Sequence, residues 1–286
     1  MFYFIGLGLG DAKDITVKGL EIVKGAKRVY LEAYTSILTD GKEKLEEFYG
    51  REVILADRDM VEQQSDELFQ DADEEDVAFL VVGDPFGATT HSDLVLRAQQ
   101  KGLQYKVIHN ASILNAAGCC GLQLYSFGEV ISIVFWTDTW KPDSYYERIA
   151  ANCKRGLHTL CLLDIKVKEQ SIENLMKGRQ IYEPPRYMTV SQAACQLLEI
   201  AERKRNAGEI PAFTENTICV GLSRVGAEDQ RIASGTLKEL SQTDLGNPLH
   251  SLVIAGHMHP LEIDMLREFA VNPTTFNTFS EDQKVK

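Results

Sequence analysis

The chain has 286 residues, of which 44% are hydrophobic and 25% are charged, and its formal net charge is −12. The composition is typical of a soluble globular protein, and the length suits two domains. The acidic excess, without any basic block, argues against nucleic acid or an anionic membrane as the main partner. No apolar run reaches the roughly 18 residues that span a bilayer.

The N-terminus and the cysteines favour a cytoplasmic protein. The N-terminus carries neither the basic stretch nor the small-residue cleavage site of a signal peptide. Six cysteines show no CxxC spacing and mostly lie in apolar segments, which predicts buried, reduced thiols. His257 and His259 lack a third ligand at a recognisable spacing, so the sequence predicts no metal site.

The first half of the chain alternates short apolar runs with amphipathic stretches. We expect strands at residues 2–7, 28–34, 52–55, 77–82 and 105–108. We expect helices at 16–26, 41–49, 58–71 and 91–101, and a helix rich in small residues near 110–125. The continuous apolar run at 77–82 is typical of a central parallel strand. This half therefore predicts a parallel α/β domain.

An acidic run from Asp57 to Asp76 contains the expected helix at 58–71. Its apolar residues fall on one face of that helix: Val61, Leu68, Phe69 and Ala72. We interpret the run as an amphipathic helix with a solvated acidic face rather than as an interaction tail.

The second half has longer connections. We expect strands at 130–135, 160–163, 217–222 and 251–254, helices at 144–151, 189–205 and 262–270, and a frayed end after Val271. This order predicts a mixed sheet. The expected architecture is two α/β domains, residues 1–112 and 113–286, with a cleft between them.

A glycine loop, Gly6-Leu7-Gly8-Leu9-Gly10-Asp11, follows the first strand. Alternating glycines predict close approach of the backbone to something outside the sheet. A dinucleotide-binding loop needs a third glycine three residues after the second, and Asp11 stands there instead. The motif therefore does not fit a dinucleotide.

Carboxylates follow several expected strands, and ligands of parallel sheets bind beyond these strand ends. The residues are Asp11, Asp84, Asp138 and Asp164. Taken singly, each is more often a helix cap or turn residue. Together, with few cations nearby, they favour a neutral or positively charged ligand over a pyrophosphate. The six histidines show no obvious catalytic dyad, and we take Asp84 and Asp138 as hypothetical proton acceptors.

Three segments together are characteristic: Gly6 to Asp11 with Thr16, Gly83-Asp84-Pro85 with Ala88 to His91, and His109 to Ile113. Their combination resembles the diphthine synthases, within the tetrapyrrole-methylase-like superfamily of S-adenosylmethionine methyltransferases. Segments 135–140, 163–169 and 182–188 extend the resemblance to all but about the last fifteen residues. Tetrapyrrole methylases usually carry proline where Leu9 stands, and leucine there is similar to the diphthine synthase branch.

The resemblance implies two α/β domains, a homodimer, and S-adenosylmethionine bound in the interdomain cleft and released as S-adenosylhomocysteine. It implies methylation of a modified histidine of translation elongation factor 2 during diphthamide synthesis. The segments 136–140 and 182–187 look like the eukaryotic form, which implies four methylations and diphthine methyl ester as product. Trimethylation only, to diphthine, is the alternative, and a tetrapyrrole methylase is a more distant one.

The resemblance also implies which residues contact the cofactor: Leu9, Asp84, Gly87, Ser112, Ile113, Leu163, Val225 and His250. It assigns no catalytic residue. Two other classes of protein stay open at this point, a nicotinamide-dependent oxidoreductase and a non-catalytic adenosylmethionine-binding scaffold.

Overall fold

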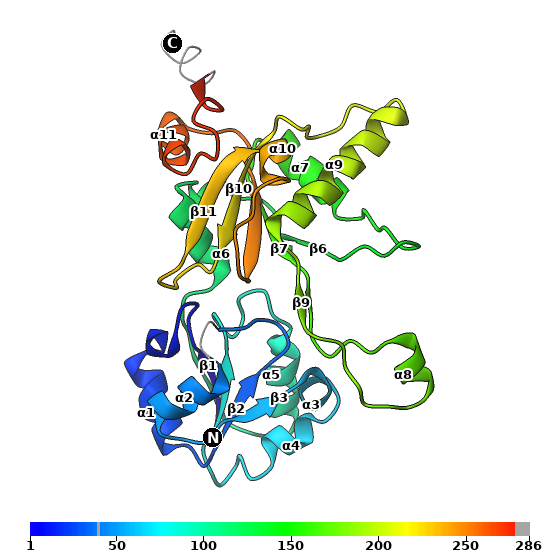
Figure 1. The fold of residues 1–286 in the computed structure, drawn as a ribbon. Coiled ribbons are helices and arrows are strands. Elements are labelled where there is room, and N and C mark those ends of the chain that lie inside the picture. Colours follow the sequence, from blue (N-terminus) through cyan, green and yellow to red (C-terminus); the bar gives the residue numbers. More distant parts are fainter. Residues whose placement is uncertain (39–40, 278–286) are drawn as a thin grey trace. The chain divides into compact units, whose positions relative to one another are not determined.

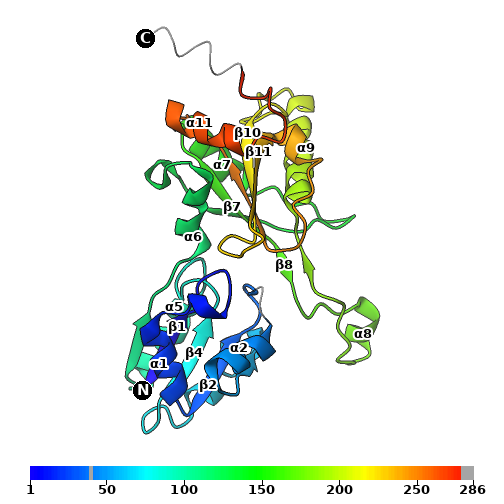
Figure 2. The same ribbon diagram turned by 60° about the vertical axis from the view of Figure 1, so that its left-hand side comes forward.

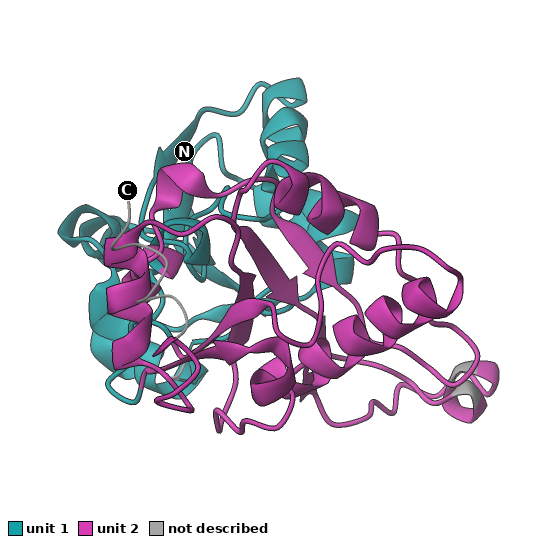
Figure 3. Ribbon diagram, turned by 90° about the horizontal axis from the view of Figure 1, so that it is seen from above, with its two compact units in different colours: residues 1–116, 225–229 teal, residues 117–224, 230–286 magenta. Residues whose placement is uncertain are grey.

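The computed structural model describes residues 1–38 and 41–277, and it divides the chain into two compact units (Figure 3). Unit 1 comprises residues 1–116 and 225–229, and unit 2 comprises residues 117–224 and 230–286. The division into functional domains at residues 1–112 and 113–286 stays a prediction. No described helix has the length and apolar character needed to cross a membrane.

Unit 1 is built on a five-stranded parallel sheet of order β3-β2-β4-β1-β5. The strands are β1 (Phe2–Gly6), β2 (Arg28–Glu32), β3 (Ile54–Ala56), β4 (Val77–Val81) and β5 (Tyr105–Ile108). Every residue of β4 is buried, because β4 lies between β2 and β1 under helices on both faces. The predicted parallel α/β fold and its central strand are confirmed.

The helices of unit 1 cover both faces of this sheet (Figure 1). They are α1 (Val17–Gly25), α2 (Lys42–Tyr49), α3 (Arg58–Glu62), α4 (Ser65–Phe69), α5 (His91–Gln100) and α6 (Ile113–Ala116), with a 3-10 turn at Ala12–Asp14. Thr16 begins α1 by accepting a hydrogen bond from the amide of Gly19 at 3.0 Å. Gly50, with φ of 66°, ends α2 in the left-handed conformation.

The expectation of one helix at 58–71 is wrong, because the acidic run forms the two short helices α3 and α4. Arg97 donates to the carbonyl of Glu62 at 2.7 Å and to Ser65 Oγ at 3.3 Å. The guanidinium thus satisfies a carbonyl that a continuous helix would pair with a later amide. The four apolar residues expected on one face are nevertheless all buried.

Unit 2 contains a five-stranded mixed sheet of order β11-β10-β12-β7-β6, in which only β6 and β7 are parallel. The strands are β6 (Ile131–Ile133), β7 (Thr159–Leu163), β10 (Ile218–Ser223), β11 (Arg231–Thr236) and β12 (His250–Ile254). The mixed sheet is as predicted, but β11 was not expected, since its sequence Arg-Ile-Ala-Ser-Gly-Thr lacks a clear apolar pattern.

Helices α9 (Val190–Asn206) and α11 (Pro260–Glu268) lie on opposite sides of this sheet (Figures 1 and 2). Thr189 and Gln192 form a capping box that starts α9, with Gln192 accepting from the Thr189 amide at 2.9 Å. Helices α7 (Tyr146–Lys154) and α10 (Leu237–Leu240) complete the main body, with 3-10 turns at Ala117–Cys120 and Leu124–Ser126.

Two further segments differ from expectation, one at the junction of the two units in the chain and one near the end of the described residues. The expected helix near 110–125 is interrupted, since α6 gives way to two 3-10 turns around Gly121, whose φ is 94°. The chain after Val271 does not fray as far as residue 277, because Phe276 is fully buried; residues 278–286 lie outside the described part.

An arm that the sequence did not predict leaves the end of β7 (Figure 1). Strands β8 (Ile165–Lys166) and β9 (Arg186–Tyr187) pair antiparallel, and the connection between them carries α8 (Ile172–Met176). Arg186 makes two bonds to Glu169, at 2.7 and 3.0 Å, and its guanidinium lies 4.2 Å from the centre of the Phe135 ring.

Candidate active site at the carboxyl edge of the parallel sheet

The loops after β1 and β4 are joined by a short antiparallel bridge. The amide of Gly83 donates to the carbonyl of Gly8 at 2.7 Å, and the amide of Gly8 donates back at 3.2 Å. Both glycines have positive φ, 77° and 80°, which L residues with a side chain rarely adopt. The glycine loop and the Gly83-Asp84-Pro85 turn therefore form one structural piece.

The alternating glycines do allow the backbone of this loop to approach other atoms closely, and these atoms belong to the same chain. A Cβ on Gly6 would lie 2.6 Å from the Gly83 carbonyl oxygen, and one on Gly8 would lie 2.7 Å from Asp14 Cβ. A Cβ on Gly10 would collide with the carbonyl of Gly226, which belongs to the same unit. The need for glycine here comes from packing within the protein.

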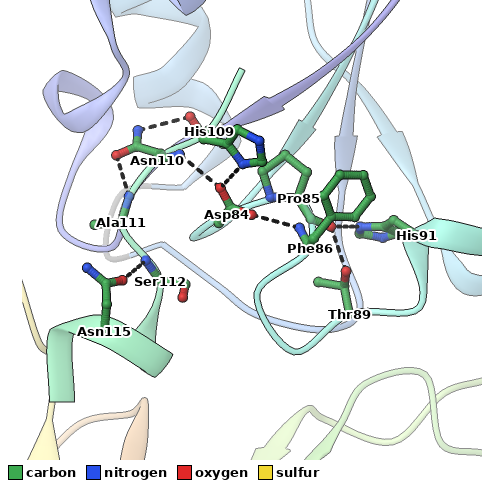
Figure 4. Close-up of polar contacts among 11 residues, drawn as sticks. Asp84, Pro85, Phe86, Thr89, His91, His109, Asn110, Ala111, Ser112 and Asn115 are labelled. Atoms are coloured by element: carbon green, nitrogen blue, oxygen red, sulfur yellow. Dashed lines mark hydrogen bonds and ion pairs between the residues drawn. The ribbon is translucent and has the colours of Figure 1, made fainter. Parts of the chain in front are cut away.

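Asp84 connects the ends of β4 and β5 (Figure 4). Its Oδ1 accepts from the amide of Phe86 at 2.9 Å, and its Oδ2 accepts from the amide of Asn110 at 3.1 Å. The same Oδ2 lies 2.8 Å from Nδ1 of His109. The Asp84 side chain is only 14% exposed, so three donors hold a carboxylate largely shielded from water.

Asn110 ties the end of β5 to the glycine loop. Its Nδ2 donates to the carbonyl of Gly6 at 3.0 Å and to that of Asp14 at 2.9 Å. Neither bond is visible as a motif, because the partners are about a hundred residues away in the chain.

Gly87 and Ser112 lie against each other beside Asp84. A Cβ on Gly87 would be 2.6 Å from Ser112 Cβ and 2.8 Å from its Oγ. Ser112 is buried, and its amide donates to Asn115 Oδ1 at 2.8 Å, which begins α6. Ile113 is the first residue of α6. The structure therefore brings Asp84, Gly87, Ser112 and Ile113 together.

The remaining expected cofactor residues lie at four places. Leu9 and Val225 are half-buried residues of unit 1. Leu163 is the last residue of β7, and His250 is the first residue of β12. Their neighbours Leu162 and Ser251 are paired between these two antiparallel strands. Whether these residues contact a cofactor stays a prediction.

His250 uses both ring nitrogens within unit 2. Its Nδ1 accepts from the amide of Val190 at 3.2 Å, and its Nε2 faces the carbonyls of Asn247 at 3.0 Å and Gly246 at 3.1 Å. Burial lowers the pKa of this imidazole, so it stays neutral with the proton on Nε2. The imidazole thus links the start of α9 to the segment that precedes β12.

The other three aspartates after strands have separate surroundings. Asp11 caps the turn at Ala12–Asp14 by accepting from the Lys13 amide at 2.7 Å. Asp164 accepts from the amide of Phe135 at 2.9 Å, and Asp138 is exposed. Asp11 thus has the capping role that is usual for a single aspartate, whereas Asp84 lies with the glycine turns of unit 1, where Asp14 Oδ2 also accepts from the amide of Gly10 at 2.8 Å. Across residues 1–38 and 41–277, no three histidine, cysteine or acidic residues are grouped as a metal site would require.

A buried pair lies beneath the turn that follows Asp84. His91 Nδ1 donates to the carbonyl of Pro85 at 2.9 Å, and Thr89 Oγ1 donates to the same oxygen at 2.6 Å (Figure 4). The other nitrogen of His91 is 4.0 Å from Glu32 Oε1, and both side chains are buried. Burial lowers the pKa of His91.

Burial raises the pKa of the Glu32 carboxyl to about 7. Within the described chain neither of its oxygens has a hydrogen-bond partner of regular geometry. Polar groups of Thr35 and Tyr34, and the more distant charge of Arg58, offset the effect of burial only in part. The carboxyl beneath the turn is therefore neutral at acidic pH and ionises only around neutrality.

Comparison with known proteins identifies the family. The family described as Tetrapyrrole (Corrin/Porphyrin) Methylases matches residues 1–241. The chain is 69% identical over 272 residues to a diphthine methyl ester synthase of Mus musculus, covering 95% of this chain and 97% of the relative. The chain belongs to the diphthine synthase branch of the tetrapyrrole methylase family. The resemblance seen in the sequence is confirmed, and the chain is a methyltransferase.

More distant relatives agree. A diphthine methyl ester synthase of Emericella nidulans is 59% identical over 285 residues, covering 99% of both chains. A crystal structure of a diphthine synthase superposes with a TM-score of 0.81 at 33% identity, covering 97% of this chain and 98% of that one. The predicted fold class is confirmed, and the oxidoreductase and scaffold alternatives are set aside.

Sequence reasoning missed the pairing of His109 with Asp84 and the two contacts of Asn110. Both residues stand in a loop that the sequence did single out, but their partners lie on other loops. The available signal was topological, because β4 and β5 flank β1 and all three carboxyl ends meet at one edge of the sheet.

Replacing Glu32 by glutamine tests the buried carboxyl. In the native protein Glu32 keeps its proton up to about pH 7, whereas the unfolded chain releases it near 4.5. The folded state therefore binds more protons between these values, and this group lowers the free energy of unfolding as pH rises. Glutamine has no such proton to lose, so the free energy of unfolding of Glu32→Gln should not fall in this way. Between pH 5 and pH 8 it should therefore rise relative to that of wild type by up to about 3 kcal/mol.

Urea unfolding at several pH values measures this difference. The matched control is Glu21→Gln, at an exposed position of α1, whose stability should track wild type throughout. A Glu32→Gln profile parallel to that of wild type would show that the carboxyl is not perturbed.

Proposed function

We propose that this methyltransferase transfers methyl groups from S-adenosylmethionine to the modified histidine of translation elongation factor 2, giving diphthine methyl ester after four methylations. The names of the curated relatives, at up to 69% identity over nearly the full chain, carry this proposal. Because the acceptor is a translation factor, we place the reaction in the cytoplasm.

The chemistry of the strand-end loops supports this cofactor. The loops 6–11, 83–91 and 109–113 contain no lysine and no arginine, and they present the carboxylate of Asp84. A pyrophosphate favours cations and free helix N-termini, whereas a cofactor with a sulfonium and an amino group suits a carboxylate and backbone carbonyls.

We assign the cofactor contacts to Leu9, Asp84, Gly87, Ser112 and Ile113, with Val225, Leu163 and His250 as further contacts. Three donors already occupy the Asp84 carboxylate, which has about four acceptor positions. One position is therefore left for a ligand donor. Gly87 leaves room beside Ser112 that any larger residue would fill.

Methyl transfer from a sulfonium is a direct displacement. The nucleophile attacks the methyl carbon, the carbon–sulfur bond breaks, and sulfur leaves as the neutral thioether of S-adenosylhomocysteine. Alignment of the three atoms is the main contribution of a protein and can supply roughly 7–11 kcal/mol at best. The turns that hold Asp84, Gly87 and Ser112 in fixed positions suit such a task.

Mass spectrometry of the product tests the function. The chain is incubated with methyl-labelled S-adenosylmethionine and with elongation factor 2 that carries the unmethylated intermediate. We expect the labelled peptide to gain four methyl groups. A gain of three would establish diphthine as the product, and no gain would refute the proposal.

A Gly87→Ala substitution tests the cofactor contacts. The new Cβ would lie 2.6 Å from Ser112 Cβ and must displace the Asp84 turn or Ser112. We expect the affinity for S-adenosylmethionine to fall by about tenfold or more, equivalent to about 1.4 kcal/mol. Calorimetry with the matched control Gly25→Ala, where nothing lies within 4 Å of the new Cβ, should give the wild-type affinity. Equal affinities for both variants would contradict the assignment.

We also propose that the chain is a homodimer, as the resemblance implies. A group of exposed apolar side chains on unit 2 supports this: Leu124, Tyr125, Leu261 and Met265. Their segments are neighbours, because Gln123 donates its amide to Glu262 of α11 at 2.8 Å. Sedimentation equilibrium should give twice the 32.0 kDa mass of one chain, and a single-chain mass would refute the dimer.

A further inference from the structure

We propose that His109 is the proton acceptor for methylation of the amine, with Asp84 as the residue that orients it. This inference rests on the proposed function, since it concerns how the amino nitrogen of the acceptor becomes a nucleophile. It departs from the sequence-based hypothesis, which gave this part to Asp84 or Asp138.

Asp84 is poorly suited to take the proton itself. Its Oδ1 accepts from the amide of Phe86, and its Oδ2 accepts from the amide of Asn110 and faces His109. Both oxygens therefore already accept hydrogen bonds from this chain, and these bonds fix the orientation of the carboxylate.

The same bonds determine which nitrogen of His109 is free. Since the Asp84 carboxylate only accepts hydrogen bonds, Nδ1 of His109 carries the hydrogen that lies between them over 2.8 Å. The neutral imidazole then has its lone pair on Nε2, which has no hydrogen-bond partner within the described chain. An adjacent carboxylate also stabilises the imidazolium that forms when Nε2 takes a proton.

Exposure separates His109 from the three buried histidines. Its side chain is 68% exposed, with the Phe86 ring at a centroid distance of 6.2 Å, whereas His91, His158 and His250 are buried. The carboxylate partners of His91 and His158 are buried as well. Among residues 1–38 and 41–277, only His109 combines an accessible ring with a paired carboxylate.

The proton balance of the reaction shows why such a group is needed. The amine lone pair forms the new carbon–nitrogen bond, the carbon–sulfur bond breaks, and the product is an ammonium ion with the proton still on nitrogen. Before the next transfer, Nε2 of His109 removes that proton and becomes imidazolium. The exposed ring then releases the proton to water, so the acceptor recovers its lone pair and the histidine its starting state.

Methylation of a carboxylate has no such requirement. A carboxylate is already a nucleophile at neutral pH, so the final ester-forming transfer releases no proton. A variant of His109 should therefore slow methylation of the amine and leave formation of the ester unchanged. A loss of folding or of cofactor binding would instead slow both reactions.

The experiment compares His109→Asn with His257→Asn, the latter at an exposed histidine of unit 2. Each variant is given elongation factor 2 carrying either the unmethylated or the trimethylated intermediate. At pH 7 we expect His109→Asn to slow amine methylation by about 100-fold, the lower end for loss of a general base. Its rate of ester formation and its affinity for S-adenosylmethionine should equal those of His257→Asn.

Two further readouts distinguish chemistry from structure. The deficit of His109→Asn should shrink as pH rises towards the pKa of the amine, because solvent then removes the proton. In addition, free imidazole should partly restore amine methylation to His109→Ala and have no effect on wild type.

The outcomes are separable. Amine methylation by His109→Asn within about twofold of wild type at pH 7, or an equal fall in both kinds of methylation, would overturn the role of His109. A wild-type chain that methylates neither intermediate would instead refute the proposed function.

Discussion

The carboxylate of Asp84 connects the loops that follow β4 and β5, and its partner His109 lies 25 residues further along the chain. It accepts from the backbone of its own turn and from the backbone after β5, so both loops are fixed relative to the sheet. Asn110 extends this connection to the glycine loop after β1. The hydrogen bonds of Asp84 and Asn110 thus hold the loops after β1, β4 and β5 together at this edge.

The glycines and the carboxylate act on the same edge in different ways. Gly6, Gly8 and Gly10 let the loops pack against one another, because a Cβ at any of them would meet backbone or side-chain atoms of this chain. Asp84 then sets the polar character of the surface that these loops form. Below them, Glu32 and His91 form a buried pair that supports the turn, and burial favours the neutral form of both groups by raising the pKa of Glu32 and lowering that of His91.

The sequence allowed the parallel sheet, its central strand and most helices to be predicted, since these follow from apolar periodicity. Helix α9, expected at 189–205, begins and ends within a residue of that range because Thr189 and Gln192 form a local cap. The break between α3 and α4 could not be predicted, because Arg97 comes from a distant helix. Strand β11 and the arm at 165–187 were missed because short or weakly apolar strands owe their pairing to partners elsewhere in the chain.

Asp84 was singled out because it follows an expected strand, whereas Gly87 and Ser112 were expected at the site only from the family resemblance. The structure places the three residues together, and their contact with a cofactor stays a prediction. The pairing of His109 with Asp84 was missed, because it depends on which strands are neighbours in the sheet and not on spacing in the chain.

The absence of lysine and arginine from the loops 6–11, 83–91 and 109–113 has a consequence for discrimination between adenine-containing molecules. A cofactor of this class shares its adenosine with nucleotides that carry phosphates. Next to the Asp84 carboxylate, a phosphate would meet an acidic group that no lysine or arginine of these loops offsets, and such a contact disfavours the wrong ligand. If these loops bind S-adenosylmethionine as we propose, the charges that they lack would disfavour ATP and the dinucleotides.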